Sequence, residues 1–137
     1  MAMSKRQVAK KYGYKSGFEM ETAEFLEGIG RFEGYETETI EFTQPEKVRK
    51  YTPDFAITKK CGGKMYIETK GRWLTDDRMK HRYIMASRPE LDIRLVFMNP
   101  NVKISKGSKT TYATYCEKYG MKYSAVAKKV PAEWLEE

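Results

Sequence analysis

Asp54, Glu68 and Lys70 have side chains that could do chemistry together, because their spacing fits two adjacent strands. Thirteen residues separate Asp54 from Glu68, and Lys70 follows two positions later. Side chains alternate between the faces of a strand, so Glu68 and Lys70 project together while Ile67 and Thr69 point the other way. Asp54, on the partner strand, can lie beside Glu68. The pattern therefore predicts two carboxylates and an ammonium at one place.

This set of groups suits hydrolysis of a phosphodiester. Carboxylate oxygens, joined by a main-chain carbonyl and waters, are ligands that Mg²⁺ or Mn²⁺ accepts. The metal can polarise a phosphodiester oxygen and lower the pKa of bound water, while a lysine orients the nucleophile or offsets developing charge. A plainer interpretation stays open at this point. Asp54 follows a proline and could be a turn residue, and Glu68 with Lys70 could be a solvated charge pair.

The charge distribution indicates a polyanionic partner. The chain has 137 residues, 26 Lys and Arg, 19 Asp and Glu, and a net charge of +7. Residues 1–16 hold five bases and no acid, residues 17–46 hold nine glutamates and one arginine, and residues 47–137 hold twenty bases and ten acids. Each base that neutralises a phosphate releases a counterion, so nucleic acid is the favoured partner. Solubility alone is the other explanation of such a surface.

Other counts exclude several classes of protein. The single histidine, His81, rules out a zinc site with two histidines. No apolar run approaches a membrane span or a secretory signal, so we expect no membrane partner and a cytoplasmic protein. Two cysteines, Cys61 and Cys116, are expected to be free thiols. The length fits one domain.

Local signals place the elements. Ser16 and Glu19 have capping-box spacing before a helix expected over 17–28, from which Glu19 or Glu21 could reach a cleft. Glu19 could equally be only a capping acid. Strands are expected over 35–42, 51–57 and 64–70, the last two as a hairpin around a Gly-rich turn. Later elements are a helix over 76–87, a strand over 91–98, a helix over 110–119 and a helical turn from Pro131. The fold class is α+β, with a central mixed sheet flanked by helices.

Two levels of resemblance add to this interpretation. Pro53-Asp54 followed by Glu68-Thr69-Lys70 resembles the PD-(D/E)xK nuclease superfamily, which implies a restriction-endonuclease-like sheet. Over residues 14–135 the chain is similar, in collinear order, to the bacteriophage endonuclease I family. The stretches that carry this similarity are Ser16-Gly17-Phe18-Glu19, Tyr51-Thr52-Pro53-Asp54-Phe55, Glu68-Thr69-Lys70-Gly71, Asp76-Asp77-Arg78, Pro89-Glu90-Leu91-Asp92-Ile93-Arg94, Lys106-Gly107-Ser108 and Pro131-Ala132-Glu133-Trp134.

The resemblance implies an enzyme that resolves four-way (Holliday) junctions and other branched DNA by paired metal-dependent nicks. It implies Asp54, Glu68 and the Thr69 main-chain carbonyl as ligands of Mg²⁺, for which Mn²⁺ can substitute, with Lys70 as catalytic lysine and Glu19 as third acid. It also implies an intertwined homodimer in which residues 16–43 are exchanged, and a bridge over 44–49. If a phage encodes the chain, the cytoplasm in which the protein is expected is that of the infected bacterium.

The expected domain layout is a basic, flexible N-terminal arm over 1–15 and one nuclease domain over 16–137. The residues expected to contact DNA phosphates are Lys5, Arg6, Lys10, Lys11, Lys15, Lys103, Lys106 and Lys109. His81 is a possible contact to a phosphate or to the attacking water. Two alternatives stay open: another nuclease of the superfamily that cuts linear duplex DNA, or a junction-binding protein without catalysis.

Overall fold

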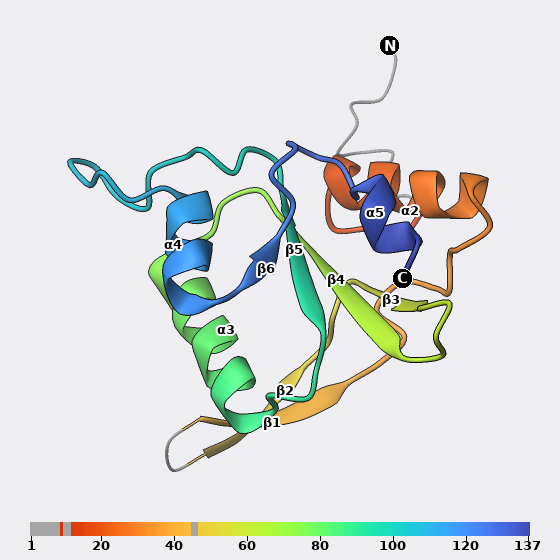
Figure 1. Cartoon of the computed structure of the whole chain (residues 1–137), viewed down its shortest axis with the longest axis horizontal. Helices are drawn as coiled ribbons and strands as arrows, with labels where there is room; N and C mark the ends of the chain where they lie inside the picture. The colour runs from red at the N-terminus through yellow and green to blue at the C-terminus, as the bar shows by residue number, and fades with distance from the viewer. Residues whose placement is uncertain (1–8, 10–11, 45–46) are drawn as a thin grey trace.

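A computed structural model describes residue 9, residues 12–44 and residues 47–137, and shows a mixed α+β fold (Figure 1). The predicted fold class, a central mixed sheet with flanking helices, is confirmed. In chain order the elements are α2 (Gly17–Gly28), β1 (Ile40–Gln44), β2 (Lys47–Tyr51), β3 (Phe55–Thr58), β4 (Lys64–Lys70), α3 (Thr75–Ser87), β5 (Ile93–Phe97), α4 (Tyr112–Tyr119), β6 (Lys122–Tyr123) and α5 (Ala132–Leu135).

The main sheet has the strand order β3-β4-β5-β6. The predicted hairpin is confirmed, because β3 and β4 pair antiparallel with Phe55 opposite Ile67. The next two pairings are parallel, and their crossovers contain α3 and α4. Every residue of β5 is buried, as expected for a strand covered on both faces. The short strand β6 was not predicted.

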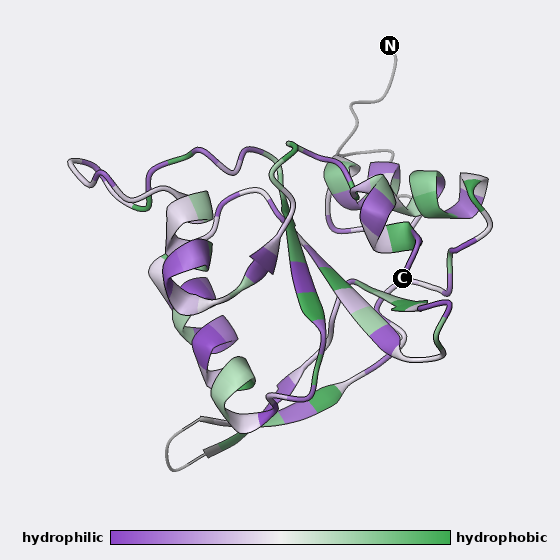
Figure 2. Ribbon diagram, viewed as in Figure 1, coloured by the Kyte–Doolittle hydropathy of each residue, from purple (hydrophilic) through white to green (hydrophobic). Residues whose placement is uncertain are grey.

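Helices cover the two faces of this sheet, α2 and α5 on one side and α3 and α4 on the other (Figure 1). Side chains of β4 alternate between two apolar clusters, with Ile67 facing the α2 side and Tyr66 facing the α3 side. Hydrophobic and hydrophilic residues alternate along the helices, as an amphipathic covering layer requires (Figure 2). The α2 cluster includes Phe18, Leu26, Phe55, Ile57 and Val96, and a third cluster under α4 includes Trp73, Leu95, Phe97, Tyr112 and Tyr115.

Strands β1 and β2 form a separate antiparallel ribbon. The strand predicted over 35–42 begins only at Ile40. Glu36 has a φ of 51° and donates its N–H to the Asp54 carbonyl, so this segment bonds away from the ribbon. Within the single chain Gln44 pairs with Lys47, so β1 and β2 lie antiparallel on either side of residues 45–46, which are outside the described residues. An extended bridge over 44–49 belongs to an exchanged dimer and stays a prediction.

The strand predicted over 51–57 is interrupted, and this break creates the site. Strand β2 ends at Tyr51 and β3 begins at Phe55. Pro53 has no N–H to donate to a ladder, which explains why pairing stops there. Tyr51 and Asp54 therefore lie where the ribbon meets the main sheet.

The helix boundaries follow local signals. Ser16 caps α2 by accepting a hydrogen bond from the Glu19 N–H at 3.1 Å. Helix α3 begins one residue before the predicted range, with the Asp77 carboxylate accepting from the Leu74 N–H. Gly120, at a φ of 69°, ends α4 in the left-handed conformation that glycine adopts without strain.

The described residues bear on two points raised by the composition, membrane-spanning helices and the state of the cysteines. Within residues 12–44 and 47–137, no helix has the length and apolar character that crossing a membrane requires. Cys61 is exposed, Cys116 is buried, and both thiols are free.

Candidate active site

Glu68 and Lys70 project to the same face of β4, as predicted. The Lys70 ammonium lies 3.4 Å from a Glu68 carboxylate oxygen, and the Glu68 side chain is only 12% exposed. Glu68 Oε1 also accepts hydrogen bonds from the Asp54 N–H at 3.0 Å and from the Tyr51 hydroxyl at 3.3 Å. The break after β2 thus supplies two donors that fix this carboxylate.

The Asp54 carboxylate turns toward the other face of β4. Its Oδ2 accepts hydrogen bonds from the Thr69 N–H at 2.9 Å and from the Thr69 hydroxyl at 2.8 Å. The sequence predicted that Asp54 would lie beside Glu68. In the structure the Asp54 main chain contacts Glu68, while the Asp54 carboxylate joins the α2 side of the sheet. Asp54 therefore connects the two faces at the end of β4.

Two further carboxylates surround Asp54. Ligand oxygens of Glu19, Glu36 and Asp54 all lie within 4.8 Å of one another. Glu19 comes from α2, so the helix cap also delivers an acid to the site. Glu36 was not singled out from the sequence, because the glutamate-rich stretch around it has the pattern of solvated faces. No sequence signal indicates its positive φ, which directs it to Asp54.

Burial and mutual repulsion raise the pKa values of these acids. The pKa of Glu19 is raised to about 7 by burial and by the charge of Asp54. The pKa of Glu68 is raised to about 7 by the same two causes, despite Lys70. Burial also raises the pKa of Asp54, although Thr69 and Lys70 oppose this. If all three carboxylates were ionised at pH 7, the positive charge near them would not be enough to balance their negative charges.

The carboxylates fit a divalent metal ion. Hard carboxylate oxygens are the ligands of Mg²⁺, and a cation would relieve the repulsion that raises their pKa values. Glu19 Oε2 is buried and has no hydrogen-bond partner among the described residues, as an atom reserved for such a ligand would be. Glu19 and Asp54 belong both to the set of acids predicted from the sequence and to the cluster in the structure, which contains Glu36 in place of Glu68.

A small cavity of about 60 Å³ lies on the α3 side of Glu68. His81 lines it, and burial together with the charge of Lys70 lowers the pKa of His81 to about 4. The ring is therefore neutral near pH 7 and contacts Trp73 edge-on. Trp73 is 1% exposed and packs beside the site. The full lining is Tyr51, Glu68, Lys70, Trp73, Asp77, Lys80, His81 and Ile84.

The lysines and arginine predicted to contact DNA fall into three groups. Lys15 lies at the acidic cluster, with its ammonium 2.8 Å from Glu36. Lys103, Lys106 and Lys109 are exposed on the segment between β5 and α4, away from this cluster in Figure 1. The others, Lys5, Arg6, Lys10 and Lys11, lie outside the described residues.

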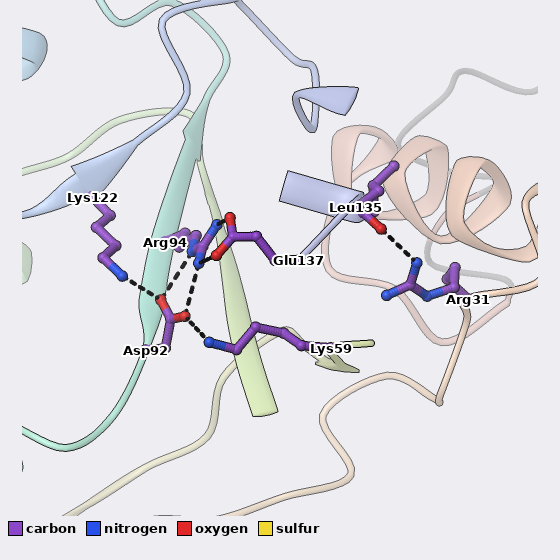
Figure 3. A network of polar contacts seen from close by, with 7 residues as sticks. All are labelled: Arg31, Lys59, Asp92, Arg94, Lys122, Leu135 and Glu137. Atoms are coloured by element: carbon purple, nitrogen blue, oxygen red, sulfur yellow. Dashed lines mark hydrogen bonds and ion pairs between the residues drawn. The ribbon is translucent and has the colours of Figure 1, made fainter. Parts of the chain in front are cut away.

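A second charged cluster lies elsewhere, around Asp92 (Figure 3). Asp92 accepts hydrogen bonds from Arg94 at 2.8 and 2.9 Å, Lys59 at 2.8 Å and Lys122 at 3.2 Å. These partners hold the pKa of Asp92 well below its usual range, although burial acts the other way. Arg94, whose side chain is 4% exposed, also donates to Glu137 beyond α5. A further bond, from Arg31 to the Leu135 carbonyl at 3.2 Å, ties α5 to the segment after α2.

Buried acids with unrelieved charge, next to a lysine at the end of a central strand, are characteristic of metal-dependent hydrolases that cleave phosphodiesters. The chain belongs to the phage endonuclease I family, whose model matches residues 1–137. The family resemblance predicted from the sequence is therefore confirmed.

Two relatives have informative names. Endonuclease I of Escherichia phage T7 is 40% identical over 131 residues, which cover 95% of this chain and 83% of the relative. Endodeoxyribonuclease 1 of Enterobacteria phage T3 is 42% identical over 111 residues, which cover 81% of this chain and 70% of the relative.

Proposed function

We propose that this protein is a divalent-metal-dependent DNA endonuclease that resolves four-way junctions by paired hydrolysis of phosphodiesters. Its assignment as a DNA-cleaving hydrolase rests on the family match and on the two named relatives. The structural observation that supports the chemistry is that Asp54 connects two groups at the end of β4. Its carboxylate lies with that of Glu19, and its N–H bonds to Glu68, which pairs with Lys70. The finer assignment, junctions as substrate, rests on the resemblance of the sequence to junction-resolving enzymes.

Asp54, Glu68 and the Thr69 main-chain carbonyl are the proposed ligands of Mg²⁺ or Mn²⁺, with Glu19 as a further acid. When bound, the metal supplies Lewis-acid polarisation of the scissile phosphate and a more acidic bound water. Tyr51 and the Asp54 N–H hold the Glu68 carboxylate in one orientation. Thr69 does the same for Asp54 with two hydrogen bonds. The acids are thus oriented before substrate arrives, which is what catalysis by fixed charges requires.

Lys70 is placed to balance charge at the reacting phosphate. Its ammonium pairs with Glu68 at 3.4 Å and lies 3.8 Å from Asp77. A quarter of its side chain is exposed, so it can reach solvent and a bound DNA strand. We assign it the role of orienting the nucleophile or stabilising negative charge that develops on the phosphate. His81 lines the cavity with a neutral ring and is a candidate contact to the attacking water or to a phosphate.

Paired cuts need two sites, and the proposal therefore includes a homodimer with a restriction-endonuclease-like subunit fold. In the single chain Glu19 already lies beside Asp54. If residues 16–43 are exchanged, the same contact joins the two chains, and residues 44–49 form the bridge. Recognition is then of branched shape, because two sites at a fixed separation fit a junction and not a base sequence. The proposed place of action is the cytoplasm of an infected bacterium.

A supercoiled plasmid with an extruded cruciform tests this function. With Mg²⁺, wild-type protein is expected to linearise the plasmid by two opposed nicks at the cruciform base, and to leave a plasmid without a cruciform intact. Equal cutting of both plasmids at defined sequences would favour a nuclease for linear duplex DNA. Binding to the cruciform plasmid without nicking would favour the non-catalytic alternative.

Exchange between subunits has its own test. Glu19→Ala and Glu68→Ala chains, each inactive alone, are refolded together and the heterodimer is isolated with two affinity tags. If Glu19 is donated across the dimer, one of the two sites is intact, and single nicks appear without paired cuts. If each site belongs to one chain, the verified heterodimer has no intact site and gives no nicks.

A further inference from the structure

A wider groove continues from the small cavity beside Glu68, between β2 and α3. Its volume is about 400 Å³. Lys80 belongs to both hollows, and Lys50 of the groove precedes Tyr51, which bonds to Glu68. The groove therefore begins next to the candidate active site. Its lining consists of Phe42, Arg49, Lys50, Asp76, Met79, Lys80 and Tyr83.

The groove has an excess of positive charge that the protein does not neutralise. Arg49 and Lys80 face the groove, with Asp76 as the acid in its lining, and Lys50 lines it from the next position of β2, where it is opposite Glu41. Among the residues that the structure describes, no ion pair engages any of these three cations, whereas Lys59, Lys60, Lys64 and Lys122 all pair with carboxylates. Unpaired cations in one groove attract a polyanion, because no internal bond must be broken first.

Lys80 is also held in place. Its ammonium lies 5.7 Å from the centre of the Tyr51 ring and 5.9 Å from that of the Phe42 ring. Contacts of a cation with two aromatic faces restrict the long lysine side chain and keep its charge between the cavity and the groove. The position of the charge is therefore set before a ligand binds.

We propose that this groove binds the backbone of the DNA strand next to the scissile phosphate, with Lys80 and Arg49 contacting its phosphates. The inference rests on the proposed nuclease function and adds to it the path of the substrate strand. Lys80 lies outside both the exchanged segment 16–43 and the bridge 44–49. With chain exchange, Phe42 would come from the other subunit and Arg49 would lie at the end of the bridge.

The test compares two double variants for binding to a four-way junction without divalent metal. Arg49→Gln/Lys80→Gln removes two groove charges. Lys60→Gln/Lys118→Gln removes two charges outside the groove, and Lys118 matches Lys80 because its ammonium also lies over a ring, that of Tyr119. The slope of log affinity against log salt should fall by about 1.4 to 1.8 for the groove variant, since each lost phosphate contact removes about 0.7 to 0.9. The control should keep the wild-type slope.

Position is tested by replacing single phosphates of the junction with uncharged methylphosphonates. Replacement next to the cleavage site should weaken wild-type binding several-fold and leave binding by the groove variant unchanged. If the groove variant loses as much affinity as wild type at these positions, or if its salt slope equals that of the control, the groove assignment is overturned. Wild type must bind the junction in both experiments and cleave it once Mg²⁺ is added. Failure of wild type to do so overturns the nuclease proposal itself. Thermal melting confirms that all variants are folded.

Discussion

Two groups of carboxylates in this molecule have opposite surroundings. Asp92 lies among Arg94, Lys59 and Lys122, and its pKa is lowered. Glu19 and Glu68 lie among other acids with fewer cations, and the pKa of each is raised to about 7. The same residue types thus form a satisfied ion-pair network at one place and a cluster with excess negative charge at the other. The difference separates a structural cluster from a candidate catalytic one, because the second needs a cation that the protein does not provide.

The two clusters also differ in what they connect. The Asp92 network joins β5, β6 and the turn after β3 to the segment beyond α5 (Figure 3). The acidic cluster joins α2 and the start of β3 to the end of β4. Substitutions in the first should therefore change stability, and substitutions in the second should change activity.

The largest expected effect is on cleavage. Glu68→Gln keeps an oxygen that can accept from Tyr51 and from the Asp54 N–H, but it removes the charge that holds a metal. Cleavage of a four-way junction should fall at least about a thousandfold, which corresponds to about 4 kcal/mol in activation free energy. Junction binding, measured by gel shift, should stay the same or strengthen. Loss of binding together with cleavage would count against a role confined to metal binding.

The next effect is on folding and concerns Asp92. Asp92→Asn leaves the buried Arg94 guanidinium with only Glu137 as charged partner. Removing one partner of a buried pair typically costs about 3 kcal/mol, measured here as the free energy of unfolding in urea. Glu136→Gln is the control, because its exposed pair with Lys60 is worth at most about 1 kcal/mol. A loss of less than about 1 kcal/mol for Asp92→Asn would erase the contrast between the two clusters.

Stability should depend on pH with opposite signs at the two clusters. The folded-state pKa values of Glu19 and Glu68 are raised from 4.5 to about 7, so the folded protein holds extra protons between these values. Without metal, the free energy of unfolding should therefore fall by about 2 kcal/mol as the pH rises from 5 to 8, after allowance for solvent screening of Glu19. The lowered pKa of Asp92 contributes stability that is present above pH 3.8 and lost at lower pH.

Urea titrations at fixed protein concentration measure this pH dependence. Adding Mg²⁺ at pH 8 should restore the stability lost above pH 5 in wild type and have little effect in Glu68→Gln, because a ligand that binds only the folded state stabilises it. If the free energy of unfolding without metal does not change between pH 5 and 8, the acids do not repel one another in the folded protein.

The smallest expected effect concerns Glu36. Glu36→Gln keeps the N–H bond to the Asp54 carbonyl and removes one carboxylate near Glu19 and Asp54. The affinity for Mn²⁺, measured by calorimetry, should fall about tenfold, the lower end of the range for loss of an outer-shell partner. Glu33→Gln is a suitable control, since Glu33 bonds to Thr58 and Lys64 away from the cluster. Unchanged affinity would show that Glu36 does not contribute to metal binding and acts only as the ion-pair partner of Lys15.

Local patterns were enough to predict much of this molecule. Alternation in β4 placed Glu68 with Lys70, the Gly-rich turn predicted the hairpin, and capping by Ser16 set the start of α2. These signals are local because each depends on residues a few positions apart.

The remaining features depend on tertiary contacts. Glu36 reaches the cluster through a positive φ and a bond to the Asp54 carbonyl, which no run of neighbouring residues indicates. The orientation of the Asp54 carboxylate toward Thr69 depends on the exact register of β3 on β4, and a shift of one residue reverses which face a side chain takes. The cations of the groove were likewise not singled out, because packing of α3 against the ribbon brings Lys80 to Lys50.

Asp54 is bonded through three different groups. Its N–H donates to Glu68, its carbonyl accepts from Glu36, and its carboxylate accepts from Thr69. A displacement of this one residue would therefore shift the neighbouring acids together. Tyr51 stands three residues away, across Pro53, at the end of the ribbon that borders the groove. Only Thr52 and Pro53 therefore separate the ribbon that borders the groove from the residue that connects the acids.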